Sequence, residues 1–368
     1  MRFIHIADTH LGAEPDKGFP WAEERKAQVS ESFLKAIDRC RAERPDLLLI
    51  AGDMFHKQPL VRELKEVDSL FASMSDVRVV IIAGNHDYIS GISNYNGFEW
   101  SDNVTFFRTE QLESVYFEDI DTEVYGLSFC HRQIHEALLD NARPVHPDRL
   151  NILLMHGGEP GNLPADRKKL LGAGFDYIAC GHIHVPLTVN ERMIYPGSTE
   201  PLERNDTGSR GYILGSIEKH GTESRIETEF GVCVESRYFK EELTVEPDTT
   251  NYELGAMIRD RIAERGEKGI FSFTLKGRRD PDIEFDTDAL MKEGRIVYLS
   301  DETEPDYDFD RLLAENRDNI IGKFIEKIKA ENVDPEVAER RSITGSSRCT
   351  REKSEDQGIT HRAFRKAA

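Results

Sequence analysis

Long apolar runs are missing from this 368-residue sequence, because no stretch approaches the ~20 residues that a membrane-spanning helix needs. Cysteine is also scarce, and no Cys-x-x-Cys spacing occurs, which is typical of reduced thiols in the cytoplasm. We therefore predict a soluble cytoplasmic protein. The five scattered cysteines are Cys40, Cys130, Cys180, Cys233 and Cys349, and Cys180 is expected to be buried in a strand.

Positive charge is under-represented: the sequence has 48 Lys and Arg but 68 Asp and Glu, and its formal net charge is -20. Nonspecific DNA affinity comes largely from Lys and Arg that neutralise phosphates. The composition therefore argues against strong DNA binding by the chain alone, although local basic patches, bound metals or a partner could supply it. A Gly-x-x-x-x-Gly-Lys-Ser/Thr loop is absent as well, which excludes that type of ATP-binding site here.

Five short polar motifs each follow an apolar run that predicts a buried strand. Because side chains at the carboxyl ends of several strands converge, these carboxylates, amides and imidazoles are expected to meet. Any one motif alone is typical of a solvated loop or a turn. Together, their mixed hard and borderline donors suit a pair of divalent transition metals, and a two-metal centre suits phosphate-ester cleavage. The motifs are Asp8-Thr9-His10, Gly52-Asp53-Met54-Phe55-His56, Gly84-Asn85-His86-Asp87, His156-Gly157-Gly158 and Gly181-His182-Ile183-His184.

These motifs resemble those of the calcineurin-like metallophosphoesterases. The extra His56 narrows the resemblance to the DNA repair exonuclease branch, the SbcD-type nucleases that are related to the meiotic-recombination nuclease of archaea and eukaryotes. The resemblance covers residues 1 to about 230 with specific motifs and continues beyond that in layout alone.

The resemblance implies a metal-ligand set. One metal would be bound by Asp8, His10 and His184. The second would be bound by Asn85, His156 and His182. Asp53 would bridge the two, with one carboxylate oxygen for each cation. Two metals roughly 3.5–4 Å apart would clamp a phosphate and activate a bridging water, and the resulting hydroxide would attack phosphorus. The resemblance favours Mn²⁺, while Mg²⁺, Fe²⁺ or Zn²⁺ would also fit.

Three further residues have catalytic roles by the same resemblance. His86 would stabilise the transition state or protonate the leaving oxygen. Asp87 would orient His86 by accepting its other ring N–H. His56 would position the DNA phosphate, and the alternative for His56 is a histidine at a helix start with no role.

The hydrophobic pattern predicts an α/β protein, a four-layer α/β/β/α sandwich over residues 1–235. Strands at 3–7, 47–51 and 77–83 with helices at 23–44 and 60–74 give a βαβαβ opening, and a second, more antiparallel sheet is expected to follow. The helix at 60–74 is a candidate for a homodimer contact, although its apolar positions also suit a core-facing helix.

Residues 240–300 are expected to form a small α/β capping domain that helps to bind DNA. Its most basic cluster is Lys276, Arg278 and Arg279, and the last two are expected in a turn before Asp280-Pro281. Lys17, near the metal rim, is a further candidate. For each of these cations, a solvated surface position is the alternative to contact with DNA.

The end of the chain is expected to contain an acidic linker at 301–310, one helix at 311–330 and a disordered tail at 342–368. The helix has an apolar stripe that must be buried on this chain or on a partner. By resemblance, that partner would be an SMC-like ATPase of the SbcC type.

The sequence therefore favours a metal-dependent DNA exonuclease, with single-strand endonuclease activity as a further possibility. By the resemblance, it would act in DNA repair as the nuclease subunit of an SbcCD-type complex. Its substrates would be double-stranded ends and single strands. The same ligands would also serve hydrolysis of a small phosphodiester, a phosphomonoester or a phosphoprotein. A noncatalytic scaffold is the third alternative, but it predicts missing ligands, and every ligand position is filled.

Overall fold

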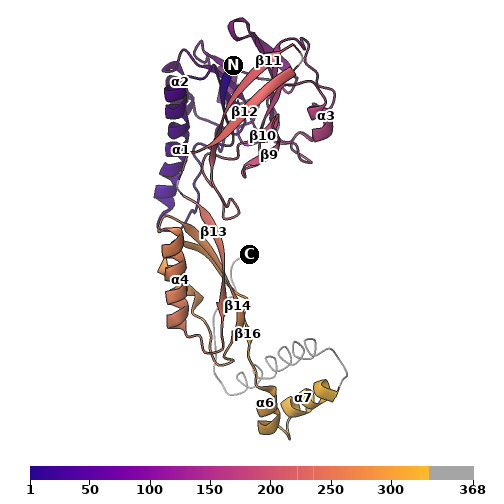
Figure 1. The fold of residues 1–368 in the computed structure, drawn as a ribbon. Helices are drawn as coiled ribbons and strands as arrows, with labels where there is room; N and C mark the ends of the chain where they lie inside the picture. The colour runs from indigo at the N-terminus through magenta and orange to yellow at the C-terminus, as the bar shows by residue number, and fades with distance from the viewer. Residues whose placement is uncertain (222, 235, 331–368) are drawn as a thin grey trace. The chain divides into compact units, whose positions relative to one another are not determined.

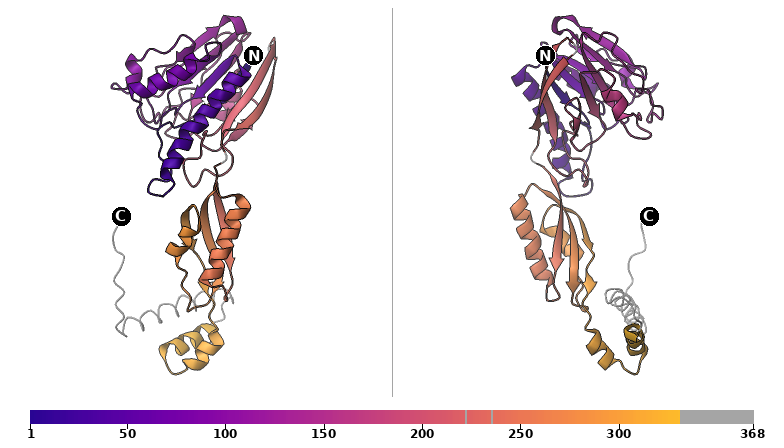
Figure 2. Two further views of the ribbon diagram at one scale, coloured as in Figure 1. Left: turned by 90° about the vertical axis from the view of Figure 1, so that its left-hand side faces the viewer. Right: turned by 45° about the vertical axis from the view of Figure 1, so that its right-hand side comes forward.

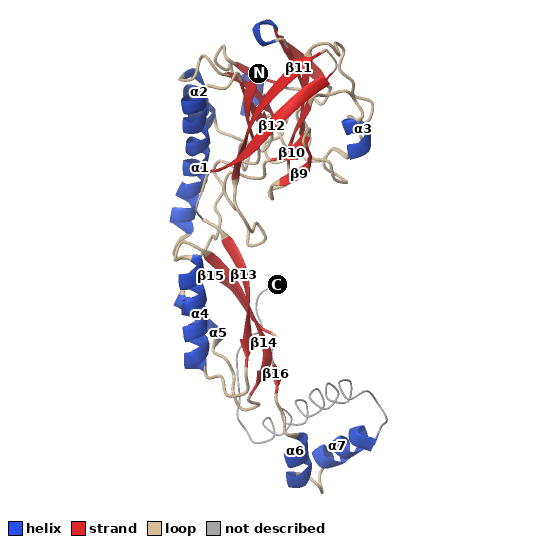
Figure 3. Ribbon diagram, viewed as in Figure 1, coloured by secondary structure: helices blue, strands red, loops and turns tan. Residues whose placement is uncertain are grey.

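The computed structural model describes residues 1–221, 223–234 and 236–330, and the chain divides into two units (Figures 1 and 2). The first unit contains residues 1–239 and 267–271, and the second contains residues 240–266 and the chain from 272 onward. Figure 3 shows that helices and strands are present in both units. The predicted disordered tail, 342–368, lies outside the described residues.

The first sheet of the first unit has the strand order β12-β11-β1-β2-β3-β4. Four of its strands are parallel neighbours, and β11 and β12 form an antiparallel hairpin at one edge. The predicted βαβαβ opening is confirmed, since α1 (Ala22–Glu43) and α2 (Val61–Ala72) connect its first three strands. The strands are β1 (Arg2–Ile6), β2 (Leu47–Ala51), β3 (Arg78–Ile82), β4 (Val104–Phe106), β11 (Gly211–His220) and β12 (Glu223–Val232).

The second sheet has the order β5-β6-β7-β8-β10-β9, and the prediction that it is more antiparallel than the first is wrong, because each sheet has two antiparallel pairs. Its four central strands are parallel, and only the edge strands β5 and β9 are antiparallel to their neighbours. The connections after β6 and β7 return the chain to the starting end of the sheet, as parallel pairing requires. The strands are β5 (Glu113–Phe117), β6 (Thr122–Gly126), β7 (Leu150–His156), β8 (Tyr177–Gly181), β9 (Leu187–Asn190) and β10 (Met193–Tyr195).

Alternating side chains place each sheet between two apolar layers. Ile4 and Ile6 of β1 pack in the core that α1 and α2 cover, whereas Phe3 packs with β7 and β8 in the core between the sheets. On β7, Leu153 packs in the outer core with Leu170 of α3 (Arg167–Leu171). The predicted four-layer α/β/β/α arrangement is therefore confirmed. Cys180 is buried in β8, as predicted.

The apolar face of α2 packs on this chain's own first sheet. Leu64, Val67 and Phe71 are buried in the helix–sheet core. A homodimer contact by this helix remains a prediction, and it would have to use other residues, such as the exposed Leu60 and Val61 at its start.

The second unit contains most of β14 (Ile270–Arg279) and β13 (Tyr238–Val245), whose first residues belong to the first unit, and all of β15 (Ile296–Asp301). In this sheet β14 lies between β13 and β15, with α4 (Asn251–Arg265) alongside (Figure 1). Leu254, Ile258 and Ile262 are the buried face of α4. This helix begins with a capping box. The Thr250 side chain accepts the Glu253 backbone N–H, and the Glu253 side chain accepts the Thr250 backbone N–H. No helix among the described residues is long and apolar enough to cross a membrane.

Three expectations for the end of the chain are wrong. Arg278 and Arg279 continue strand β14 instead of forming a turn, because they pair with β16 (Glu304–Pro305). This pairing also gives structure to part of the expected linker at 301–310. The expected single helix is two helices, α6 (Phe309–Glu315) and α7 (Ile320–Ala330), because the Asn319 side chain accepts backbone N–H groups at a new helix start.

Candidate metal centre

The seven predicted ligands lie together at the carboxyl ends of strands from both sheets. Asp8 and His10 follow β1, Asp53 follows β2, and Asn85 follows β3, so parallel neighbours in the first sheet present four ligands at one edge. His156 is the last residue of β7, and His182 and His184 follow β8 in the second sheet. The packing of the two sheets is therefore what brings ligands together across more than 170 positions of sequence.

The first ligand set is Asp8, His10 and His184. One donor atom from each lies within 4.8 Å of the others. The Nε2 atoms of His10 and His184 are 3.1 Å apart. Asp8 and His10 are almost fully buried, so a cation held there would be shielded from bulk water.

The second ligand set is Asn85, His156 and His182. Asn85 Oδ1 lies 3.0 Å from His156 Nε2 and 3.1 Å from His182 Nδ1. Because the amide is neutral, it adds an oxygen donor to this set without adding another negative charge to a buried site.

Asp53 lies between the two ligand sets. Its Oδ2 is 3.7 Å from His10 Nε2 and 3.3 Å from His156 Nε2, so one oxygen faces both sets. Its Oδ1 instead accepts the backbone N–H of His86 at 2.8 Å. The binding of one cation by each oxygen remains a prediction, and Oδ2 is the oxygen that faces a histidine of each set.

The backbone around the ligands is strained. Asp8, His10, Asp53 and His182 all have positive φ, at 51°, 45°, 50° and 93°. Non-glycine residues rarely adopt this region, and such strain tends to gather at functional sites. Gly84, which precedes Asn85, has no room for a side chain, because a Cβ there would lie 2.2 Å from Asp53 Oδ1.

Backbone and carboxylate contacts orient the ligands from behind. His156 Nδ1 donates to the Ala51 carbonyl at 2.9 Å, which leaves the Nε2 lone pair directed into the centre. Both oxygens of Asp8 accept the backbone N–H of His182, at 3.0 and 2.9 Å. Asp206 Oδ2 lies 3.6 Å from His184 Nδ1. Sequence reasoning missed Asp206, since it belongs to no motif and only the tertiary fold places it behind His184.

Burial and neighbouring Asp and His side chains shift the pKa values of these ligands, and the ligand sets contain no Lys or Arg. Burial raises the pKa of Asp8 to about 6 and lowers the pKa of His182 to about 4. For His156, burial lowers the pKa but the facing Asp53 and Asp8 outweigh it, so the pKa rises to about 9. Buried carboxylates with imidazole and amide donors form a set that fits two divalent first-row metals.

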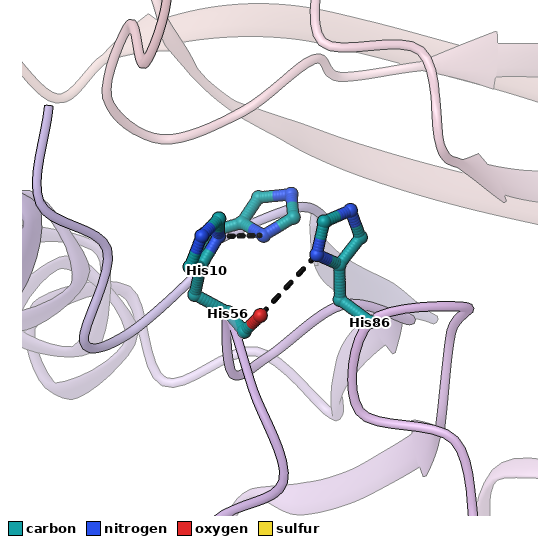
Figure 4. A group of neighbouring side chains, drawn as sticks. All are labelled: His10, His56 and His86. Carbon is teal, nitrogen blue, oxygen red and sulfur yellow. Dashed lines mark hydrogen bonds between the residues drawn. The ribbon is translucent and has the colours of Figure 1, made fainter. Parts of the chain in front are cut away.

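His86 and His56 lie beside the first ligand set (Figure 4). His86 Nδ1 donates to the carbonyl oxygen of His56 at 3.2 Å, and the His56 and His10 Nδ1 atoms are 3.4 Å apart. The rings of His10 and His86 meet edge to face at 4.7 Å. The predicted catalytic histidines are thus next to the ligands, and His86 is oriented by a backbone carbonyl.

The expectation that Asp87 accepts a ring N–H of His86 is wrong. Its carboxylate instead accepts the Gly84 N–H at 2.8 Å, the Phe55 N–H at 3.2 Å and the Tyr95 hydroxyl at 2.9 Å. Asp87 therefore ties together the two loops that carry Asp53 and Asn85. It acts on the centre by positioning backbone.

The four predicted DNA-contact cations all have partners within the chain. Lys17 is exposed and pairs with Glu14 in the first unit. In the second unit, Lys276 pairs with Glu242, Arg278 pairs with Asp306, and Arg279 donates to the Ile283 carbonyl. Their contact with DNA remains a prediction, and each would have to exchange a partner for a phosphate.

We expect Asp206→Asn to weaken metal binding by ~10–100-fold, as loss of a carboxylate behind a ligating histidine commonly does. The variant retains one acceptor for the Leu202 and Glu203 backbone N–H groups that Asp206 now binds, so the loop should keep its fold. Titration calorimetry with Mn²⁺ measures the effect. An unchanged affinity would mean that His184 needs no such support.

Comparisons with known proteins agree with this geometry. A model of the calcineurin-like phosphoesterase family matches residues 1–186. The chain is 28% identical to the uncharacterized metallophosphoesterase YhaO of Bacillus subtilis, over 89% of this chain and 87% of that protein. It is 28% identical to the DNA double-strand break repair protein Mre11 of Methanopyrus kandleri, over 86% and 76% of the two chains. It is 25% identical to the SbcD subunit of the nuclease SbcCD of Staphylococcus epidermidis, over 80% and 83%. The chain therefore belongs to the calcineurin-like metallophosphoesterases, in the branch of the SbcD and Mre11 proteins, and is a metal-dependent phosphoesterase.

Proposed function

We propose that this protein is a DNA phosphodiesterase that uses two divalent metals and releases nucleotides from DNA ends, with single strands as a further substrate. The observation that supports this most is the pair of ligand sets that share Asp53 Oδ2, with His86 and His56 next to them. The relatives named as nuclease and as break-repair proteins support DNA as the substrate and DNA repair as the role.

Two cations bound at these ligands would supply Lewis-acid polarisation of the phosphoryl oxygens and an activated water. In the reaction, the water oxygen forms a bond to phosphorus and gives up a proton to solvent, while the P–O bond to the leaving nucleotide breaks and its electron pair stays on the leaving oxygen. His86, in its protonated form, donates Nε2–H to that leaving oxygen, because its Nδ1–H is held by the His56 carbonyl. The backbone carbonyl of His56 orients the His86 ring, and the proposed role of the His56 ring is to position the phosphate.

Mn²⁺ is the proposed cation, with Mg²⁺, Fe²⁺ and Zn²⁺ as the alternatives. The mixed donor set of four imidazoles, two carboxylates and one amide would accept several of these metals, so availability contributes to the choice.

The test is nucleotide release from end-labelled linear duplex DNA with Mn²⁺, with a chelator in the parallel reaction. Release that requires Mn²⁺ supports the proposal. Hydrolysis of a bis-aryl phosphodiester without any action on duplex or single-stranded DNA would instead favour a small-molecule phosphodiesterase. Adding the ATPase partner distinguishes that outcome from a nuclease that acts only in its complex.

We further propose that α6 and α7 bind an SMC-like ATPase of the SbcC type as partner. Ile321 and Ile325 are buried within this part of the second unit, so these two residues of the predicted stripe are already covered. Ile320 is 72% exposed and Phe324 is half-buried beside it, which leaves apolar surface for a partner helix.

Deleting residues 311–368 should abolish co-purification with the ATPase and leave hydrolysis of a bis-aryl phosphodiester at the wild-type rate. The reason is that the centre is built wholly from the first unit. Substituting Ile320→Lys in the full chain is the milder variant. Unchanged association of both variants would contradict the docking proposal.

A further inference from the structure

A cavity of about 350 Å³ adjoins the metal centre in the first unit. Asn85 and His86 line its inner wall, so it is continuous with the place where a scissile phosphate would lie. His56 also lines the cavity, and the rest of the wall comes from residues that the metal chemistry does not use: Lys57, Gln58, Tyr88 and Arg132.

The charge of this cavity differs from that of the chain as a whole. Lys57 and Arg132 are both exposed, and neither forms an ion pair within the described part of the chain. Many other surface cations are paired, as Lys169 is with Asp140 and Arg41 with Asp38. In a protein with a net charge of -20, two uncompensated cations on one cavity create a local site for an anion.

The loops that carry these residues are tied to one another. Gln58 Nε2 donates to the Tyr88 carbonyl at 2.6 Å, and the Ile89 N–H donates to the Phe129 carbonyl at 2.7 Å. These two bonds join the loop of Lys57 to the loop of Tyr88, and that loop to the segment before Arg132. The cavity wall is therefore preorganised.

The segment that leads to Arg132 is fixed on both sides. Glu110 Oε1 accepts the backbone N–H groups of Cys130 and His131, at 2.8 and 2.9 Å. Beyond Arg132, the Ile134 carbonyl accepts the Leu163 N–H at 2.9 Å. The backbone on either side of Arg132 is thus fixed, and the exposed Arg132 side chain lines the cavity.

We propose that Lys57 and Arg132 bind the phosphate that neighbours the scissile one in a polynucleotide, which makes them specificity-determining residues. This inference rests on the proposed function and deepens it. A substrate with a single phosphate would fill the metal centre and leave both cations without an anion. A polynucleotide supplies the second phosphate on the same strand, and the planar guanidinium of Arg132 suits phosphate geometry.

The test compares two single-stranded substrates with Mn²⁺, a thymidine dinucleotide with one phosphodiester and a trinucleotide with two. Wild type should prefer the trinucleotide in kcat/KM by roughly tenfold or more, the size expected for a charge-assisted contact to phosphate. Lys57→Gln and Arg132→Gln should each reduce that preference, and the double variant should remove it. Cleavage of the dinucleotide should not change, and Arg132→Lys should retain part of the preference.

Arg225→Gln is the matched control, because Arg225 is exposed on β12 at the end of the sheet opposite the centre. The salt dependence of trinucleotide cleavage should become shallower in the cavity variants and not in the control. An unchanged trinucleotide preference in the double variant would overturn the subsite alone. If wild type hydrolyses a bis-aryl phosphodiester but neither nucleotide substrate, in the presence of the ATPase partner as well, the proposed function fails and this inference fails with it.

Discussion

Replacing Asp53 by Asn is expected to abolish phosphodiester cleavage. The substituted side chain can still accept the His86 backbone N–H with its oxygen, so the loop should fold as before. Its NH₂ group would then take the place of Oδ2, the one atom that faces both His10 and His156. Both ligand sets would lose their shared anion, and the loss of activity should exceed the ~10–100-fold that removal of an outer partner costs.

Three measurements check this result: nucleotide release, metal content after dialysis, and the rise in Tm that Mn²⁺ produces. Wild type should be stabilised by the metal because only its folded state binds it, whereas Asp53→Asn should show a much smaller rise. Asp76→Asn is the control, since Asp76 is exposed and precedes β3 at the end away from the centre. A variant with normal activity and two bound metals would refute the bridging role.

The second large effect is expected for His86→Ala. This variant should keep both metals, because His86 belongs to neither ligand set, while kcat falls by ~10²–10⁴, the usual contribution of a positioned general acid. The loss should be smaller on a bis(4-nitrophenyl) phosphate, because nitrophenolate leaves with little need for a proton.

His220→Ala is the control for this experiment, since His220 is exposed at the far end of β11. Metal titration and the kcat values on both substrates are the measurements. An equal loss on DNA and on the nitrophenyl ester would exclude leaving-group protonation and leave transition-state stabilisation. Loss of metal would show instead that His86 is a ligand.

The sequence alone determined the strands and the candidate ligands, because both depend on neighbouring residues. An apolar run such as Leu47–Ala51 followed by Gly52 and Asp53 is a local signal, and the strand is found at those residues. The resemblance of the motifs added the grouping into two ligand sets, and the structure brings these side chains together.

The tertiary structure decided whatever depends on residues far apart. The parallel core of the second sheet is set by crossover connections, which the strand sequences do not encode. Asp206 lies behind His184, and Asp87, which the resemblance pairs with the His86 ring, instead accepts the Tyr95 hydroxyl. A short polar residue can serve many partners at similar cost, so its local sequence does not select one.

Long-range contacts also decide where some strands end and which side chains line the cavity. Arg278 and Arg279 belong to β14, where β16 pairs with them. Lys57 and Arg132 are 75 positions apart and each resembles an ordinary solvated cation, until the fold places both on one cavity beside His86. Local sequence thus determined which groups could do chemistry, and long-range pairing of strands and loops decided which of them meet, because that pairing depends on the whole chain and on no single segment.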